Sequence, residues 1–258
     1  MITVDDTKCK FKEFYYTLNE IGYSIELSIY DDVKEYLSNK KPAPSENISQ
    51  YYLEFLKSSI QRRYLNDLLE KIQERSKNRN DLARISISLV QRIPYDCDKV
   101  NYDLKYDPYT KIRYPYEVIS DNKGICCEKS LLLAFLLKEL GFGVALFVFK
   151  EENHMALGIK SPEEFSFFQT GYAFIETTAP SIVTDFQLNY MESNKLGIFW
   201  HNLKSFPMII PLCDGISFNG VYVEFCDAKE WNELNGKYRH EGGYYFNRRL
   251  KLIRKYGF

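Results

Sequence analysis

The sequence lacks the features that mark several classes of metal-stabilised or disulfide-stabilised protein. Its 258 residues contain no Cys-x-x-Cys pair and only three histidines, whereas structural zinc sites usually combine such pairs with histidine. Its six cysteines are scattered along the chain and do not form the dense pattern of a disulfide framework. The Asp-x-Asp-x-Asp-Gly pattern of a calcium loop is also missing. We therefore expect no metal, no cofactor and no disulfide scaffold.

Charge of one sign and long apolar runs are missing as well. The 34 Lys and Arg nearly balance the 35 Asp and Glu, so no basic footprint for nucleic acid is expected. The unbroken apolar run at residues 131–137 is far too short to span a bilayer. The first residues are acidic and have no secretory apolar segment. By default these absences favour a cytoplasmic protein without a nucleic-acid or membrane partner.

Aromatic residues, in contrast, are abundant. The chain has 21 Tyr and 18 Phe, and 45% of its residues are hydrophobic against 27% charged. This composition supplies ample surface for a buried core and is typical of a globular protein. The length fits one large domain, or a core with a smaller extension.

The spacing of apolar residues predicts a mixed N-terminal part. Residues 23–29 alternate as a half-buried strand does, and residues 50–77 carry apolar side chains at helical spacing. Pro94 should end the helix that follows. The predicted segments are a strand at 23–29, helices at 31–38, 50–77 and 82–93, a turn-rich break at 41–45 and a surface loop at 96–116. We interpret residues 1–80 as an N-terminal α/β extension, mainly helical, and residues 81–258 as the core.

The second half contains a segment that is apolar on every face. Residues 126–140 read as a helix that ends at Gly141, and such a helix is buried and central. Strands are expected at 143–149, 154–159 and 172–177, and then at 221–225, followed by an amphipathic terminal helix at 244–256. The sequence thus predicts an α+β fold in which one buried helix packs on an antiparallel sheet.

Three residues in this block have the side chains that nucleophilic cysteine chemistry needs. Cys126 stands at the expected helix start, after a glycine that allows a sharp turn, and the unpaired amides of a first helical turn favour a thiolate. His154, on the second strand, supplies a base that can later act as an acid. Glu176, on the third strand, can hold the other imidazole nitrogen.

Four segments carry a resemblance to a known family. They are Gly-Ile-Cys-Cys-Glu-Lys-Ser at 124–130 before the Leu-rich helix, Asn-His-Met-Ala-Leu-Gly at 153–158, the strand at 172–180, and Val-Gln-Arg-Ile-Pro-Tyr at 90–95. Together they resemble the transglutaminase-like branch of the papain-like cysteine hydrolases. The resemblance implies a papain-like, transglutaminase-like core in which Cys126 is the nucleophile, His154 the base and Glu176 the orienting residue. It also makes Gln91 the candidate oxyanion-hole side chain.

The chain departs from the family pattern at two positions. Glu176 stands where Asp is common, and a second thiol, Cys127, follows Cys126. The register favours Cys126, because it places Glu128 two positions after the nucleophile, but a shift of one residue would exchange the two cysteines. The implied activity is amide-bond hydrolysis or acyl transfer on a peptide or protein, with hydrolysis preferred.

The alternative is a non-catalytic binding module of the same family, with the aromatic segments at 102–116 and 165–172 as its surface. Oligomeric state leaves no mark on this sequence.

Overall fold

The computed structural model describes residues 8–100, 111–188, 203–237 and 242–258. Helices and strands are mixed through the chain, as the α+β prediction requires. The described range omits most of the predicted aromatic surface at 102–116, together with His201 and His240.

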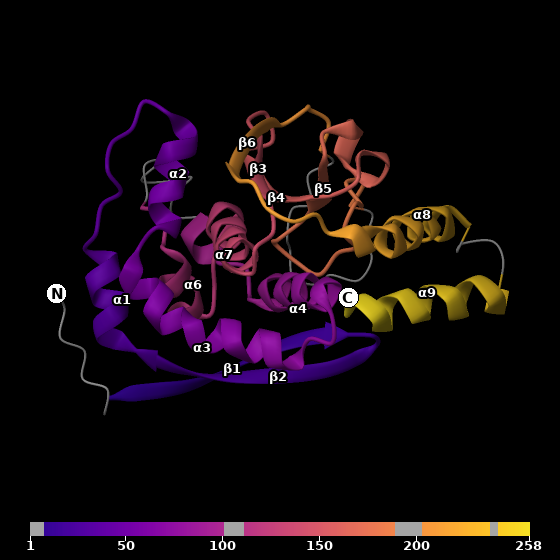
Figure 1. Ribbon diagram of the computed structural model, residues 1–258. Coiled ribbons are helices and arrows are strands. Elements are labelled where there is room, and N and C mark those ends of the chain that lie inside the picture. The colour runs from indigo at the N-terminus through magenta and orange to yellow at the C-terminus, as the bar shows by residue number, and fades with distance from the viewer. Residues whose placement is uncertain (1–7, 101–110, 189–202, 238–241) are drawn as a thin grey trace.

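A β-hairpin opens the described chain. β1 (Cys9–Leu18) and β2 (Ile21–Tyr30) pair antiparallel, and Asn19 and Glu20 between them both have positive φ, as a two-residue hairpin turn of type I′ requires. The predicted strand at 23–29 lies inside β2, and α1 (Asp31–Ser38) follows as expected. Figure 1 shows the hairpin running along the edge of the molecule beside α3 (Ser59–Arg75) and α4 (Arg79–Arg92).

The prediction of one long helix at residues 50–77 is wrong, because the structure has two helices there, α2 (Ile48–Leu56) and α3. Ser58 has an extended backbone between them. The buried side chain of Gln61 donates a hydrogen bond of 2.6 Å to the Phe55 carbonyl, which the break leaves without a helical partner. Uniform apolar spacing across the break concealed it.

A short helix also replaces the end of the loop predicted at 96–116. α6 (Pro115–Asp121) begins with proline at its first position, where the missing N–H costs nothing. The Glu117 carboxylate accepts a hydrogen bond of 2.8 Å from the Tyr114 N–H and so caps the helix start. Asn122 ends it in a left-handed conformation.

The central helix, α7 (Cys126–Glu139), agrees with the sequence prediction. Every side chain from Glu128 to Leu137 is buried. Figure 1 shows α7 in the middle of the molecule, with the larger sheet on one side and α4 and α6 on the other. Burial on all sides explains why this helix has no polar face.

The larger sheet has four antiparallel strands in the order β5-β4-β3-β6. Its strands are β3 (Val144–Phe149), β4 (His154–Lys160), β5 (Tyr172–Ile175) and β6 (Met208–Cys213). The first three were predicted, although β5 ends just before Glu176, and β6 was missed. α7 packs on one face of β3 and β4. On the other face, Phe147, Phe149 and Phe174 join a separate aromatic cluster that includes Trp231.

The strand predicted at 221–225 is wrong, because those residues begin α8 (Tyr222–Lys237) after a 3₁₀ turn, η4 (Asn219–Val221). Val221, Glu224, Ala228 and Trp231 are the buried positions, and their spacing is helical. Glu224 is buried in an ion pair with Arg84 of α4, at 2.6 Å. A carboxylate on the buried face disguised the helical period. α9 (Gly242–Tyr256) contains the predicted terminal helix and lies beside α8 (Figure 1).

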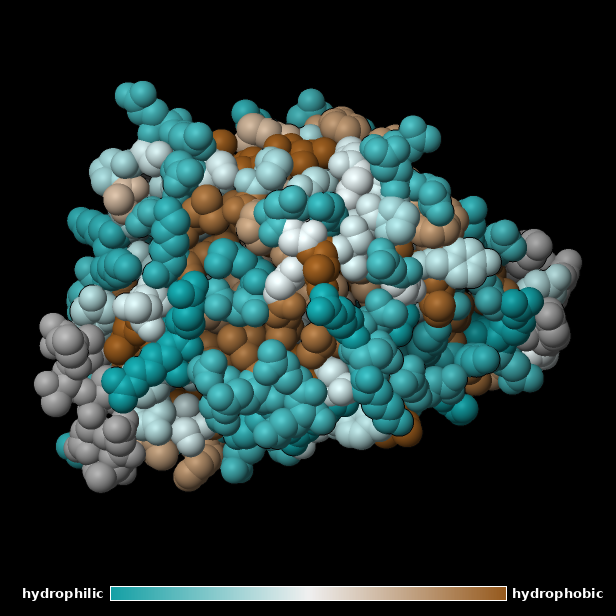
Figure 2. Space-filling model, in the orientation of Figure 1, coloured by the Kyte–Doolittle hydropathy of each residue, from teal (hydrophilic) through white to brown (hydrophobic). Residues whose placement is uncertain are grey.

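One hydrophobic core crosses the predicted boundary at residue 80. Phe14, Ile25 and Leu65 belong to the same buried cluster as Leu133 and Leu146. The N-terminal part therefore packs directly against the core, and the division into 1–80 and 81–258 stays a prediction. In the view of Figure 2, hydrophobic residues show in the recessed middle of the face and hydrophilic residues surround them.

Candidate active site

Cys126 is the first residue of α7, and the chain before it is held from two directions. The Gly124 N–H donates to the Pro94 carbonyl, and the Gly124 carbonyl accepts from the Asp96 N–H, both at 3.2 Å. The Glu128 carboxylate caps the helix by accepting from the Ile125 N–H at 3.0 Å. The half-buried thiol therefore stands at a helix N-terminus, where partial positive charge favours a thiolate.

His154 and Glu176 meet at the edge of the sheet. His154 is the first residue of β4, and Glu176 directly follows β5, which is the neighbouring strand. The His154 Nε2 lies 2.8 Å from the Glu176 Oε2. Only 14% of the His154 side chain and 1% of the Glu176 side chain are exposed. The structure thus brings together the predicted His and Glu, and leaves Nδ1 as the ring nitrogen available to the thiol.

The second carboxylate oxygen of Glu176 is also fully engaged. Oε1 accepts hydrogen bonds from the Thr177 N–H at 2.9 Å and from the N–H and hydroxyl of Thr178 at 2.8 Å each. Burial alone raises the pKa of Glu176, but the charge of His154 and the hydrogen bonds from His154 and Thr178 outweigh it. The pKa therefore lies below its ordinary value, and Glu176 is ionised.

The thiol of Cys126 and the imidazole of His154 shift each other's pKa in the directions that favour an ion pair. The hydrogen bond from Cys127 contributes most to lowering the Cys126 pKa, burial opposes it, and His154 and the Met155 N–H lower it further. Burial lowers the His154 pKa, but Glu176 and Cys126 outweigh this and raise it well above its usual range. Cys126 therefore favours the thiolate and His154 the imidazolium.

The two adjacent cysteines differ in what surrounds them. The hydrogen bond to Cys126, together with burial and the charges of Cys126 and Glu128, raises the Cys127 pKa well above its ordinary value. Cys127 is then a neutral thiol, whereas Cys126 is the thiol whose pKa is lowered by His154. This contrast supports the register that makes Cys126 the nucleophile.

Gln91 lies on α4 behind the His–Glu pair. Its carboxamide nitrogen donates to the Glu176 carbonyl at 2.8 Å and to the Ser181 carbonyl and hydroxyl at 3.2 and 3.1 Å. The side chain is only 4% exposed. Its amide hydrogens therefore bind the chain at Glu176 and at Ser181, on the two sides of Thr178. The oxyanion role of Gln91 stays a prediction, and these contacts leave that nitrogen little capacity for it.

Tyr95 is a site residue to which the sequence assigned no role. It forms a parallel bridge with Gly124, and its phenol oxygen is placed to accept from the backbone N–H of Cys126. Burial raises its pKa, as do the negative charges of Cys126, Cys127 and Glu176. Its hydroxyl therefore stays protonated and can donate. The signal was visible in the Ile-Pro-Tyr that closes the helix before the cysteine, but one sequence gave no reason to place its ring at the thiol.

A comparison with protein families identifies the domain that contains these residues. Residues 63–176 match the family whose description is transglutaminase-like domain. This chain carries a transglutaminase-like domain. The matched range starts inside α3 and ends at Glu176, so it contains all four predicted site residues and Tyr95. Comparisons with curated proteins and with solved structures gave no match.

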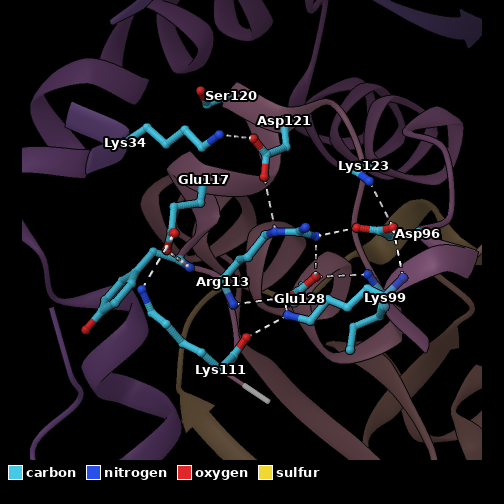
Figure 3. A network of polar contacts seen from close by, with 12 residues as sticks. Lys34, Asp96, Lys99, Lys111, Arg113, Glu117, Ser120, Asp121, Lys123 and Glu128 are labelled. Atoms are coloured by element: carbon cyan, nitrogen blue, oxygen red, sulfur yellow. Dashed lines mark hydrogen bonds and ion pairs between the residues drawn. The ribbon is translucent and has the colours of Figure 1, made fainter. Parts of the chain in front are cut away.

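Next to the thiol, a network of fixed charges holds the start of α7 within the transglutaminase-like domain (Figure 3). The Arg113 guanidinium lies among carboxylates, at 2.8 Å from Asp96, 3.1 Å from Asp121 and 3.2 Å from Glu128. Glu128, which is fully buried, also pairs with Lys99 at 2.6 Å. The network anchors the segments before α6 and after α4 to the helix that carries Cys126.

The described part of the transglutaminase-like domain and its surroundings contain no group of three or more His, Cys, Asp or Glu side chains arranged to hold a metal ion. All six cysteines of the chain are free thiols. None of the helices within the described ranges combines the length and the apolar character needed to cross a bilayer.

Proposed function

We propose that this protein is a cysteine-dependent amide-bond hydrolase or acyl transferase of the transglutaminase-like type, acting on a peptide or protein. The observation that carries the proposal is the His154–Glu176 hydrogen bond of 2.8 Å next to Cys126, a thiol at a helix start whose pKa His154 helps to lower. Each member has the pKa direction that its role requires, because the thiol is acidic, the imidazole basic and the carboxylate ionised.

The first half of the reaction forms a thioester. The Cys126 thiolate attacks the amide carbonyl carbon, and the carbonyl oxygen becomes an oxyanion. The His154 imidazolium then gives its proton to the leaving nitrogen, the carbon–nitrogen bond breaks, and an amine departs. Neutral His154 and an acyl group on Cys126 remain.

The second half releases the acyl group. His154 takes a proton from water, which attacks the thioester, and the products are a carboxylic acid and the regenerated thiolate–imidazolium pair. An amine in place of water would give acyl transfer instead. We prefer hydrolysis, because water needs no binding site of its own, whereas acyl transfer requires a bound amine acceptor.

Two donors are in place for the oxyanion. One is the Cys126 N–H at the first turn of α7, which is directed at the Tyr95 oxygen, and the other is the Tyr95 hydroxyl itself. We assign the side-chain share of this task to Tyr95, because its hydroxyl adjoins the reacting residue. Gln91 then supports Glu176 through the main chain.

Alkylation of the thiols tests the proposal without a known substrate. Iodoacetamide should label Cys126 much faster than the exposed Cys97 and Cys226 between pH 5 and 7, where ordinary thiols are mostly protonated. Mass spectrometry of timed samples gives the rate for each cysteine. The proposal fails if Cys126 reacts no faster than those two internal references, or if Cys126→Ala leaves a detected hydrolytic activity intact.

A specific observation favours a second candidate function, that of a protein-binding module. The predicted aromatic segment at 165–172 presents Phe168, which is 64% exposed and has the unfavourable φ of 43°, next to Phe206, which is 63% exposed. Both rings line a cavity of about 120 Å³ that also contains Phe149, whose ring adjoins His154. Slow alkylation of Cys126, together with peptide binding that Phe168→Asn abolishes, would support this candidate over the enzyme.

A further inference from the structure

Lys129 is a buried charged residue for which the proposed mechanism has no use. It is the third residue after Cys126 on α7, so its side chain lies near the same face of the helix. Its exposed fraction is 0%. The ammonium group donates hydrogen bonds to three backbone carbonyl oxygens: Ile93 at 2.6 Å, Thr178 at 2.9 Å and Gln91 at 3.3 Å.

A buried ammonium is costly unless its protons are satisfied. In the protonated form three N–H donors meet three carbonyl acceptors, so the hydrogen-bonding capacity of Lys129 is filled, and the neutral amine keeps two of these donors. Burial lowers the Lys129 pKa to about 7, and the nearby charge of Glu176 acts in the opposite direction. A methionine or leucine would fill the same space more cheaply, and this cost suggests that the contacts themselves matter.

The three carbonyls belong to the segments that carry the rest of the site. Gln91 and Ile93 are at the end of α4, and the chain continues from them through Pro94 to Tyr95. Thr178 is two residues beyond Glu176, and its own N–H and hydroxyl bind the Glu176 carboxylate. One ammonium group therefore joins the helix of the nucleophile to the segment of the oxyanion donor and to the segment of the orienting carboxylate.

Gln91 reinforces the same junction from α4. Its carbonyl accepts from Lys129, and its side chain donates to the carbonyl of Glu176. The segment from Glu176 to Thr178 is thus held by α4 through Gln91 and by α7 through Lys129. Without Lys129, α7 would keep the contact of the Ser130 hydroxyl with Thr177 Oγ1, at 3.0 Å, but would lose its hydrogen bonds to the carbonyls at both places.

We propose that Lys129 is a positioning residue, which sets the place of the Cys126 sulfur relative to the His154–Glu176 pair and to Tyr95. This inference rests on the proposed cysteine chemistry and extends it to a residue that does not touch the substrate. Small displacements of a thiol from its imidazole weaken the ion pair that activates it. Lys129 acts by preventing them.

Lys129→Met tests this role, because methionine keeps a long apolar stem and the helix but cannot donate to the three carbonyls. Leu133→Ala is the matched control, since Leu133 is also fully buried on α7 and its side chain cannot bind a carbonyl. For each protein, the iodoacetamide rate of Cys126 is measured from pH 4 to 9, with Cys97 as internal reference, and thermal unfolding is followed by circular dichroism.

We expect the midpoint of the Cys126 pH profile to rise in Lys129→Met by about one pH unit or more, which lowers its alkylation rate about tenfold at any pH below the wild-type midpoint. Leu133→Ala should lose stability and keep the wild-type midpoint. Unchanged midpoints in a folded Lys129→Met protein would overturn the inference and leave the proposed function standing. If wild-type Cys126 itself reacts as an ordinary thiol, the proposed function fails first.

Lys129→Gln provides a second measurement if the methionine variant does not fold. Its shorter side chain keeps two N–H donors and no charge. A positioning role predicts a midpoint between those of wild type and an ordinary thiol. A wild-type midpoint together with lowered thermal stability would show that Lys129 only stabilises the fold, and would overturn the inference.

Discussion

Two groups of buried polar side chains flank the first turn of α7, and they differ in the kinds of side chain that they contain. On one side, Glu128 and Asp96 form ion pairs with the guanidinium of Arg113 and the ammonium of Lys99. On the other side, Glu176 pairs with His154, and His154 lies next to Cys126, whose pKa it lowers while its own pKa is raised. Both groups contain a carboxylate that is almost completely buried.

The first group stabilises the start of the helix, and the second group is the one that would carry out the proposed reaction. A network of guanidinium, ammonium and carboxylate groups holds its geometry because each carboxylate is bound by more than one partner. The thiol–imidazole pair can exchange a proton at low cost, which acyl transfer requires. Glu128 and Glu176 share burial and residue type, so only their partners distinguish an anchor from a participant in the proposed reaction.

The largest effect on activity should follow from removing the charge that faces the imidazole. In Glu176→Gln the amide can no longer stabilise the imidazolium, so turnover should fall about 10³-fold, while the free energy of unfolding changes far less. Steady-state kinetics on a cleaved peptide and urea unfolding measure the two quantities. Equal losses in both would make Glu176 a structural carboxylate like Glu128, and the contrast between the two groups would disappear.

The reverse outcome is expected in the fixed-charge network. Arg113→Ala leaves Glu128 and Asp96 buried with fewer counter-charges and should lower the free energy of unfolding by about 3 kcal/mol. Lys123→Ala is the control, because that lysine also reaches Asp96 but is 42% exposed, and it should cost less than about 1 kcal/mol. A large change in the Cys126 alkylation rate in folded Arg113→Ala would contradict the separation of the two groups.

Tyr95→Phe removes one hydroxyl beside the thiol and leaves the ring. We expect kcat to fall about 100-fold, as for the loss of one oxyanion donor, with little change in the iodoacetamide rate of Cys126, since alkylation forms no oxyanion. Comparing kcat with alkylation rates for the same preparations checks this. Gln91→Leu would give that pattern instead if the sequence-based assignment of the oxyanion donor is correct.

The last expected effect is a pH dependence of stability from Lys129, which leaves the proposed chemistry untouched. Its pKa is about 7 in the fold and close to the ordinary value of 10.5 when the chain is unfolded. Between these values the unfolded state binds the proton and the folded state does not. This residue therefore makes the free energy of unfolding rise with pH, by at most about 1.4 kcal/mol per pH unit. Urea titrations from pH 7 to 10 should show a shallower slope in Lys129→Met, and equal slopes would contradict the lowered pKa.

The spacing of apolar residues was sufficient to predict a helix or strand wherever neighbouring residues alone determined it. Residues 126–140 are apolar on every face, and α7 is buried on every face. The predicted strands that carry His154 and precede Glu176 formed next to each other, and these two residues lie in contact. Local pattern failed at Ser58 and at 221–225, because a side-chain bond from Gln61 and an ion pair to Glu224 override the local spacing.

The sequence by itself determined the α+β class, the central helix with a thiol at its start, and the choice of His154 and Glu176 as that thiol's companions. These follow from periodicity and side-chain chemistry, which adjacent residues carry. Only the tertiary structure decided that the pKa of Cys126 is lowered while that of Cys127 is raised, that Tyr95 lies at the thiol, and that Lys129 joins three segments. Those properties depend on burial and on contacts between residues tens of positions apart, and a single sequence does not encode them in any local pattern.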